Sequence, residues 1–149
     1  MFKDVVEACK KYAFESSDYP VIFSIENHCC VEQQDKMADI LINILGELLY
    51  SNPISQEEEE LPSPEQLKRK ILIKAKKLPA DGTEDAGISK KLSDLVNYIE
   101  AVKFNGFDNA EAKFYHMSSF KETDTISYIE EKGVEFVKYN SRQISRWGW

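Results

Sequence analysis

The sequence lacks any apolar stretch close to the ~20 residues that a helix needs to span a membrane. Its first residues, MFKDVVEACKKYAF, also lack the basic start and the apolar run of a secretory signal peptide. We therefore expect any contact of this chain with a membrane to be peripheral.

Positive charge is scarce. Nineteen Lys and Arg residues stand against 26 Asp and Glu, which gives a net charge of -7 at pH 7. A general nucleic-acid binder needs a basic footprint to displace counterions from phosphates, so the composition argues against nucleic acid as a partner. A local basic site within this acidic chain remains compatible with the composition.

Cysteine is also sparse. The three cysteines, Cys9, Cys29 and Cys30, are odd in number, and two of them are adjacent. Neighbouring cysteines rarely form a good disulfide, and this spacing does not suit zinc. The simplest interpretation is a reduced, intracellular chain, and we expect a cytoplasmic protein.

The chain does contain enough apolar residues for a core. It has 149 residues, of which 42% are hydrophobic, so it is one compact domain or a piece of a larger one. Apolar residues at helical spacing predict helices over 2–14 and 31–50, the second ended by Ser51-Asn52-Pro53. Short apolar runs predict a strand buried on both faces at 21–25 and a strand with a buried centre at 70–74. This alternation predicts an α/β fold with a parallel sheet.

The second half of the chain has a weaker pattern. Residues 78–91 are small, charged and glycine-bearing, so they are predicted to be a linker, and 54–66 a surface loop. Further elements are expected in the following places: a strand near Val102–Phe104, a strand end at Met117–Phe120, and helices over 121–131 and 133–143.

Glu26 follows the first predicted strand. Ligands gather at the carboxyl ends of strands in parallel α/β proteins, and a carboxylate there is a hard ligand for Ca²⁺ or Mg²⁺. The alternative is a solvated acid at a strand end, which position alone favours. His28 and His116 lack a nucleophile or second histidine at informative spacing, so we interpret both as structural.

Lys74 and Lys76 lie at the end of the second predicted strand. Their i, i+2 spacing points both side chains to one face, roughly 6–7 Å apart, which suits two separate phosphate groups. The alternative is a solvated strand end, and spacing alone does not decide. Ser119 begins an S-x-x-E capping box, so it is expected to be a helix N-cap, a position that also suits an anion. Arg146 is within reach of a phosphate but would usually be a surface charge.

Six stretches together resemble eukaryotic phosphoinositide-specific phospholipase C. YPVIFSIENHC at 19–29, QQDKMA at 33–38 and LPSPEQLKRKILIKAKKL at 61–78 resemble the later part of its X region. LSDLVNYIEAVKFNGF at 92–107 and HMSSFKET at 116–123, followed by EFVKYNSRQISR at 135–146, resemble the start of its Y region. The sequence around LVNYIEAVKFNGF is most similar to the β type of this family. The expected organisation is thus the X region over 1–78, a linker over 79–91 and the Y region over 92–149.

The resemblance implies a fold and a reaction. In that family, the X and Y regions are two halves of one distorted TIM barrel. The implied reaction is calcium-dependent cleavage of phosphatidylinositol 4,5-bisphosphate into diacylglycerol and inositol trisphosphate. It also implies a peripheral membrane surface and upstream activators as partners, with G-protein subunits among them if the protein is of the β type.

The resemblance also implies site residues. Glu26 matches the family's glutamate ligand to calcium, and Lys74 and Lys76 match the lysine pair that contacts the ring phosphates. Ser119 and Arg146 match a serine and an arginine that also bind phosphate. For Glu26 and the lysine pair, the resemblance favours the functional interpretation over the structural one.

This chain also departs from the family pattern. The family's two catalytic histidines and its other calcium ligands lie earlier in the X region, before Met1, and neither His28 nor His116 matches them. After Arg146 the family usually continues with an apolar residue, Tyr and Pro, whereas this sequence reads Trp147-Gly148-Trp149. A TIM barrel takes about 250 residues, so an incomplete barrel is expected. We therefore expect a fragment of a hydrolase that is inactive by itself, with a non-catalytic phosphoinositide-binding or regulatory module as the alternative.

Overall fold

Four parallel strands form one sheet with the order β1-β2-β3-β4. The computed structural model describes residues 1–55, 57–79, 87–104, 113–119 and 121–135. The bounds of the strands are β1 (Val21–Ser24), β2 (Ile71–Ala75), β3 (Ile99–Ala101) and β4 (His116–Met117). The predicted α/β class with a parallel sheet is confirmed.

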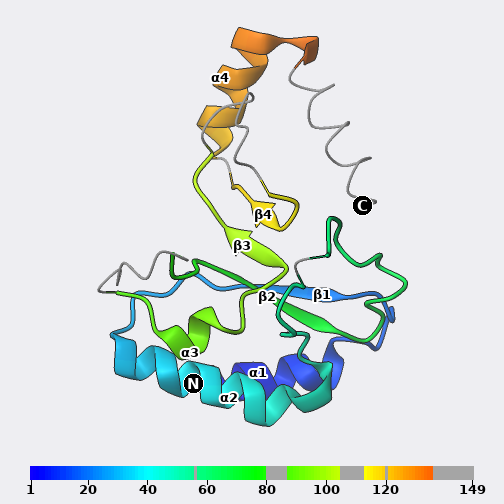
Figure 1. Cartoon of the computed structure of the whole chain (residues 1–149), viewed down its shortest axis with the longest axis vertical. Helices are drawn as coiled ribbons and strands as arrows, with labels where there is room; N and C mark the ends of the chain where they lie inside the picture. The colour runs from blue at the N-terminus through cyan, green and yellow to red at the C-terminus, as the bar shows by residue number, and fades with distance from the viewer. Residues whose placement is uncertain (56, 80–86, 105–112, 120, 136–149) are drawn as a thin grey trace.

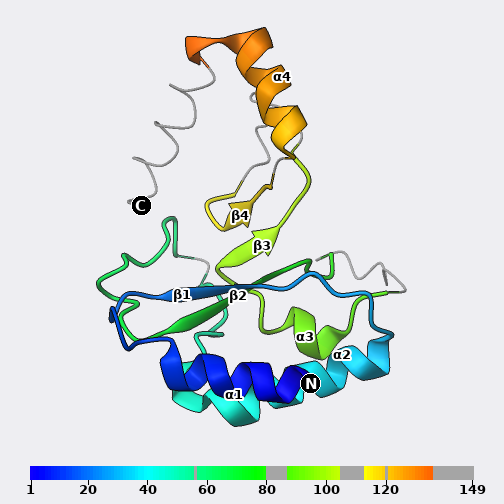
Figure 2. The same cartoon turned by 180° about the vertical axis from the view of Figure 1, so that it is seen from behind.

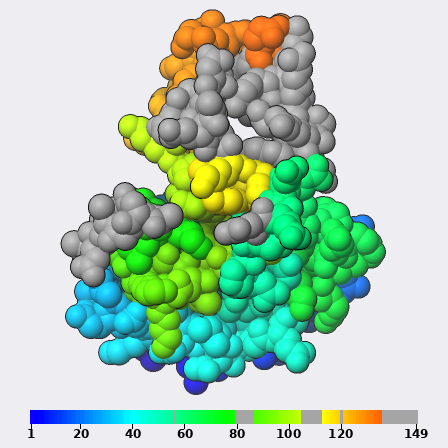
Figure 3. Space-filling model, viewed as in Figure 1, coloured from blue at the N-terminus to red at the C-terminus, as the bar shows by residue number. Residues whose placement is uncertain are grey.

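Three helices cover one face of the sheet at β1 and β2 (Figures 1 and 2). They are α1 (Phe2–Tyr12), α2 (Val31–Leu45), which continues into the 3-10 turn η1 (Gly46–Leu48), and α3 (Lys90–Ser93). A fourth helix, α4 (Glu122–Lys132), follows β4. In the space-filling view, β4 lies above the body that the earlier elements form, and α4 lies beyond it at the top (Figure 3).

The main core lies between the helices and β2. Alternate strand residues Ile71, Ile73 and Ala75 point to the helices and are almost completely buried. They pack against Leu41 and Leu45, which belong to the apolar stripe of α2. Because side chains alternate across a strand, this contact fixes which residues of β2 face the opposite side.

A smaller cluster fills part of the other face of the sheet. Leu72 and Ile99 pack there against Leu67 and Tyr98, and the Tyr98 ring lies 5.0 Å from that of Tyr50. Burial and the neighbouring Tyr50 hydroxyl raise the pKa of Tyr98 well above its ordinary value. Both faces of β2 are therefore covered, which accounts for its continuous apolar run.

β1 differs from its prediction. Ile22 is 36% exposed, and side-chain burial alternates along β1. Within the described ranges β1 lies at the edge of the sheet, and the smaller cluster on the face that Ile22 shares with Leu72 does not include Ile22. The prediction that this strand is buried on both faces is therefore wrong for these residues.

Three predicted boundaries also differ from the structure. α2 ends at Gly46, whose φ of 55° is a left-handed conformation that suits glycine, so it ends before Ser51-Asn52-Pro53. The third strand comes earlier than Val102–Phe104, because parallel pairing of Lys74 with Ile99 sets its register. α4 has Lys121 as its N-cap, so Ser119 is not the cap. The helix predicted over 133–143 lies mostly outside the described residues.

Candidate functional site

The carboxyl ends of all four strands open into one pocket of about 710 Å³. Each strand, or the loop that follows it, contributes a pair of lining residues with i, i+2 spacing. The pairs are Ser24 with Glu26, Lys74 with Lys76, Ala101 with Lys103, and Met117 with Ser119.

The strand register explains why these pairs share one face. Ser24 pairs with Lys74, and Ala101 pairs with Met117, so in this parallel sheet the paired residues point to the same side. This is the carboxyl edge of a parallel sheet, where ligands of such folds gather. The pocket therefore lies where the fold favours a binding site.

Lys74 and Ser119 are in direct contact in this pocket. The Lys74 ammonium donates a hydrogen bond of 2.8 Å to the Ser119 hydroxyl. Lys74 is half-buried, whereas Ser119 is exposed. The contact leaves the ammonium with further hydrogen-bond donors and the hydroxyl with a proton to donate, so the pair is able to bind an anion together.

Lys76 and Lys103 also line the pocket, and both are exposed. Neither ammonium has a hydrogen bond or ion pair to another described residue. By contrast, Lys77 donates to the Val96 carbonyl and, at 2.8 Å, to Asn97 Oδ1. Burial lowers the pKa of Lys77. Sequence reasoning missed Lys103, although it follows β3 as Lys76 follows β2.

Glu26 lies in the loop after β1 and is exposed at the pocket. His28 lines the same pocket and is also exposed. The ranges that the structure describes contain no group of three or more His, Cys, Asp or Glu side chains able to hold a metal ion. Because Ca²⁺ takes six to eight oxygen ligands, the described residues alone do not fit a calcium site, and Glu26 is at most one ligand of a larger set.

Gln34 of α2 is a pocket residue that sequence reasoning missed. Its side chain is buried, and its amide nitrogen donates to the carbonyls of Cys29 at 2.8 Å and Gly87 at 2.6 Å. Its amide oxygen accepts from the backbone N–H of Ser89 at 3.0 Å. One side chain thus joins the loop that carries Glu26 to the chain segment that leads into α3.

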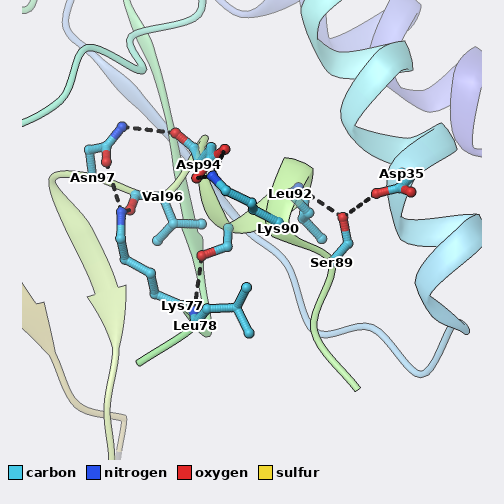
Figure 4. Close-up of polar contacts among 10 residues, drawn as sticks. Asp35, Lys77, Leu78, Ser89, Lys90, Leu92, Asp94, Val96 and Asn97 are labelled. Atoms are coloured by element: carbon cyan, nitrogen blue, oxygen red, sulfur yellow. Dashed lines mark hydrogen bonds and ion pairs between the residues drawn. The ribbon is translucent and has the colours of Figure 1, made fainter. Parts of the chain in front are cut away.

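Ser89 and Ser93 fix the start of the segment that carries β3, and Figure 4 shows Ser89 beside Asp35 and Leu92. Ser89 is fully buried, caps α3 by accepting from the Leu92 N–H at 3.1 Å, and donates to Asp35 of α2. Ser93 accepts from the Leu78 N–H at 2.9 Å. The contact of Ser93 with Leu78 and that of Gln34 with Gly87 thus anchor the chain on either side of residues 80–86.

His116 lies on the opposite face of the sheet from Ser119. Its Nε2 lies 3.9 Å from Glu100, and its Nδ1 accepts from the Lys113 N–H at 3.3 Å. Desolvation lowers the pKa of His116, against the opposing effect of Glu100. His116 does not line the pocket, and Arg146 lies outside the described residues.

Two family profiles match the chain. Residues 1–77 match the X domain of phosphatidylinositol-specific phospholipase C, and residues 92–147 match its Y domain. The chain belongs to the phosphatidylinositol-specific phospholipase C family. The phospholipase C family uses Ca²⁺.

Similar proteins include catalytic and inactive family members. The chain is 39% identical to 1-phosphatidylinositol 4,5-bisphosphate phosphodiesterase delta-3-A of Danio rerio and 37% identical to the delta-1 form of Homo sapiens. Each match covers 98% of this chain, and 23% and 24% of the two relatives. It is also 34% identical, again over 98% of its length, to inactive phospholipase C-like protein 2 of Mus musculus, of which it covers 16%. The chain thus spans about a quarter of the length of the delta phospholipases, and the β-type likeness stays a prediction.

Solved structures agree with the fold. The crystal structures of PLC21 from S. officinalis and from L. pealei each match with a TM-score of 0.80 and 39% identity. Each match covers 94% of this chain and 21% of the other. The four-stranded sheet of this phospholipase C chain is therefore part of a TIM-type barrel. Among the described residues, no helix is both long and apolar enough to cross a membrane.

Proposed function

We propose that this chain forms part of the phosphoinositide site of a calcium-dependent phospholipase C. The proposed substrate is phosphatidylinositol 4,5-bisphosphate, cleaved to diacylglycerol and inositol trisphosphate at a membrane surface. The observation that carries the proposal is the contact of Lys74 with Ser119 in a pocket that Lys76 and Glu26 also line. All four residues come from the carboxyl ends of parallel strands, where barrel enzymes bind their substrates.

Each residue has a proposed role that fits its chemistry. Lys74 and Lys76 bind phosphate groups of the inositol ring as point charges, and the Ser119 hydroxyl donates to one of the phosphate oxygens. Arg146 is proposed to bind phosphate as well, on the strength of the sequence resemblance. Glu26 is proposed to supply one oxygen ligand to Ca²⁺, with the remaining ligands coming from outside the described residues.

Headgroup binding tests the proposal directly. The purified chain is titrated with inositol trisphosphate by calorimetry, alongside a Lys74→Gln/Lys76→Gln variant. We expect binding that weakens with salt and falls at least tenfold in the variant, because two charge-assisted contacts are lost. Lys10→Gln/Lys11→Gln on α1 removes the same charge away from the pocket and is expected to retain affinity. Equal affinities for both double variants would contradict the proposal.

A second candidate function is a non-catalytic phosphoinositide-binding or regulatory module. The observation that favours it is the similarity to an inactive phospholipase C-like protein over 98% of this chain. Both candidates predict headgroup binding, so hydrolysis separates them. Release of inositol trisphosphate from vesicles is measured with the full-length protein that contains this chain, with and without Ca²⁺. Calcium-dependent release supports the enzyme, and binding without release supports the module.

A further inference from the structure

Lys103 is a third lysine in the proposed phosphoinositide pocket, and it follows β3, a different strand from that of the lysine pair. It follows β3 by two residues, and its i, i+2 spacing puts it on the same face as Ala101, which pairs with Met117 of β4. Lys76 follows β2, the other neighbour of β3. Lys103 therefore lies between the lysine pair and the strand that leads to Ser119.

The pocket concentrates positive charge in an acidic protein. Its described lining contains three lysines and one glutamate, whereas the whole chain has a net charge of -7. Like charges that share a concave site repel one another unless an anion lies between them. Three ammonium groups around one pocket therefore favour a ligand with several negative groups.

Lys103 has the contacts of a binding residue rather than a structural one. It is exposed and has no hydrogen bond or ion pair to another described residue. Lys77 is a useful contrast, because its ammonium is tied to Val96 and Asn97. The Lys103 ammonium thus keeps all three of its donors for a ligand in the pocket.

We propose that Lys103 contacts a phosphate group of the bound phosphoinositide headgroup and favours headgroups with several phosphates. This inference rests on the proposed function, because it places the new contact in the same site. Lys74 and Lys76 bind phosphate from the end of β2, Ser119 from the segment after β4, and Lys103 adds a donor from the segment after β3. A ligand with a single phosphate gains less from this arrangement than one with three.

Calorimetry on the whole chain tests the inference with two soluble probes, inositol trisphosphate and inositol 1-phosphate. For Lys103→Gln we expect about three- to tenfold weaker binding of the trisphosphate and a smaller loss for the monophosphate. Lys103→Arg retains the charge and is expected to retain most of the affinity. Lys11→Gln, on the exposed face of α1, is the matched control and is expected to bind as the unchanged chain does.

The possible outcomes are distinguishable. If the unchanged chain binds and Lys74→Gln weakens binding while Lys103→Gln does not, the role of Lys103 is overturned and the proposed function stands. If the unchanged chain does not bind the trisphosphate, both fail.

A vesicle assay separates the headgroup from the lipid surface. It compares phosphatidylinositol 4,5-bisphosphate with phosphatidylserine at equal total charge. A loss with both vesicles, but not with the soluble trisphosphate, would mean that Lys103 meets the lipid surface, and would overturn the headgroup contact.

Discussion

The Lys74 ammonium reaches Ser119 across a strand to which neither residue belongs. Lys74 lies in β2 and Ser119 follows β4, so β3 lies between them. The 2.8 Å hydrogen bond joins residues 45 positions apart in the sequence. On the face that they share, the residue of β3 in register with Met117 is Ala101, whose methyl group leaves the space open.

The first prediction concerns this pair. Lys74→Gln and Ser119→Ala are expected to couple by less than about 1 kcal/mol in the free energy of unfolding, because the contact is solvent-accessible. For each variant, the loss in binding free energy for inositol trisphosphate is expected to exceed the loss in the free energy of unfolding. A double-mutant cycle with urea unfolding and calorimetry measures both couplings. A coupling of several kcal/mol in unfolding would show that the pair is structural.

The second prediction concerns Ala101. Ala101→Leu places three more carbon atoms between Lys74 and Ser119, so we expect it to separate them and to weaken headgroup binding about tenfold. Ala101→Ser changes the volume little and is the matched control. Calorimetry measures the affinity, and thermal melting checks that the sheet persists. Unchanged binding in Ala101→Leu would contradict the claim that an open space at β3 is needed.

The third prediction concerns Gln34. Gln34→Leu leaves the carbonyls of Cys29 and Gly87 and the N–H of Ser89 without this partner, so we expect a loss of about 2–4 kcal/mol in the free energy of unfolding. Gln33→Leu, one residue earlier and exposed, is expected to change it by less than about 0.5 kcal/mol. Urea unfolding measures the free energy of unfolding of both variants. Equal losses would contradict a specific role for the Gln34 amide.

The fourth prediction concerns pH. Burial lowers the pKa of His116 from its ordinary value of 6.5, so the unfolded chain takes up this proton more readily than the folded chain. The contribution to stability is therefore present above pH ~6.5 and is lost as the pH falls below it. Urea midpoints at several pH values between neutral and mildly acidic measure the effect. His116→Gln is expected to flatten this part of the curve, and an unchanged slope in this variant would contradict the assignment to His116.

The sequence predicts β2 and its lysine pair well. The run Ile71-Leu72-Ile73 is continuous because both faces of this strand are covered, and the i, i+2 spacing of Lys74 and Lys76 puts them on one face with the pocket. These features depend on local pattern alone. They can therefore be predicted without knowing which elements pack together.

Tertiary contacts account for what the sequence did not predict. Ser119 has the local pattern of a helix cap, but its hydroxyl accepts from Lys74 and the helix begins later. Gln34 resembles any polar residue of an amphipathic helix, and its hydrogen bonds to Gly87 and Ser89, both distant in the sequence, distinguish it. β3 is only three residues long and contains Glu100, so its apolar pattern is too weak to place it.

The Gln34 side chain helps to anchor the chain segment between Leu78 and Gly87. It holds the backbone at Cys29 and Gly87 together, and Ser93 holds Leu78, so residues on both sides of 80–86 are anchored without help from the peptide bonds between them. Closing a loop between two anchored ends costs conformational free energy that grows only slowly with the length of the loop. Lengthening the chain between Leu78 and Gly87 should therefore change the free energy of unfolding only slightly, because both ends of the segment keep these contacts.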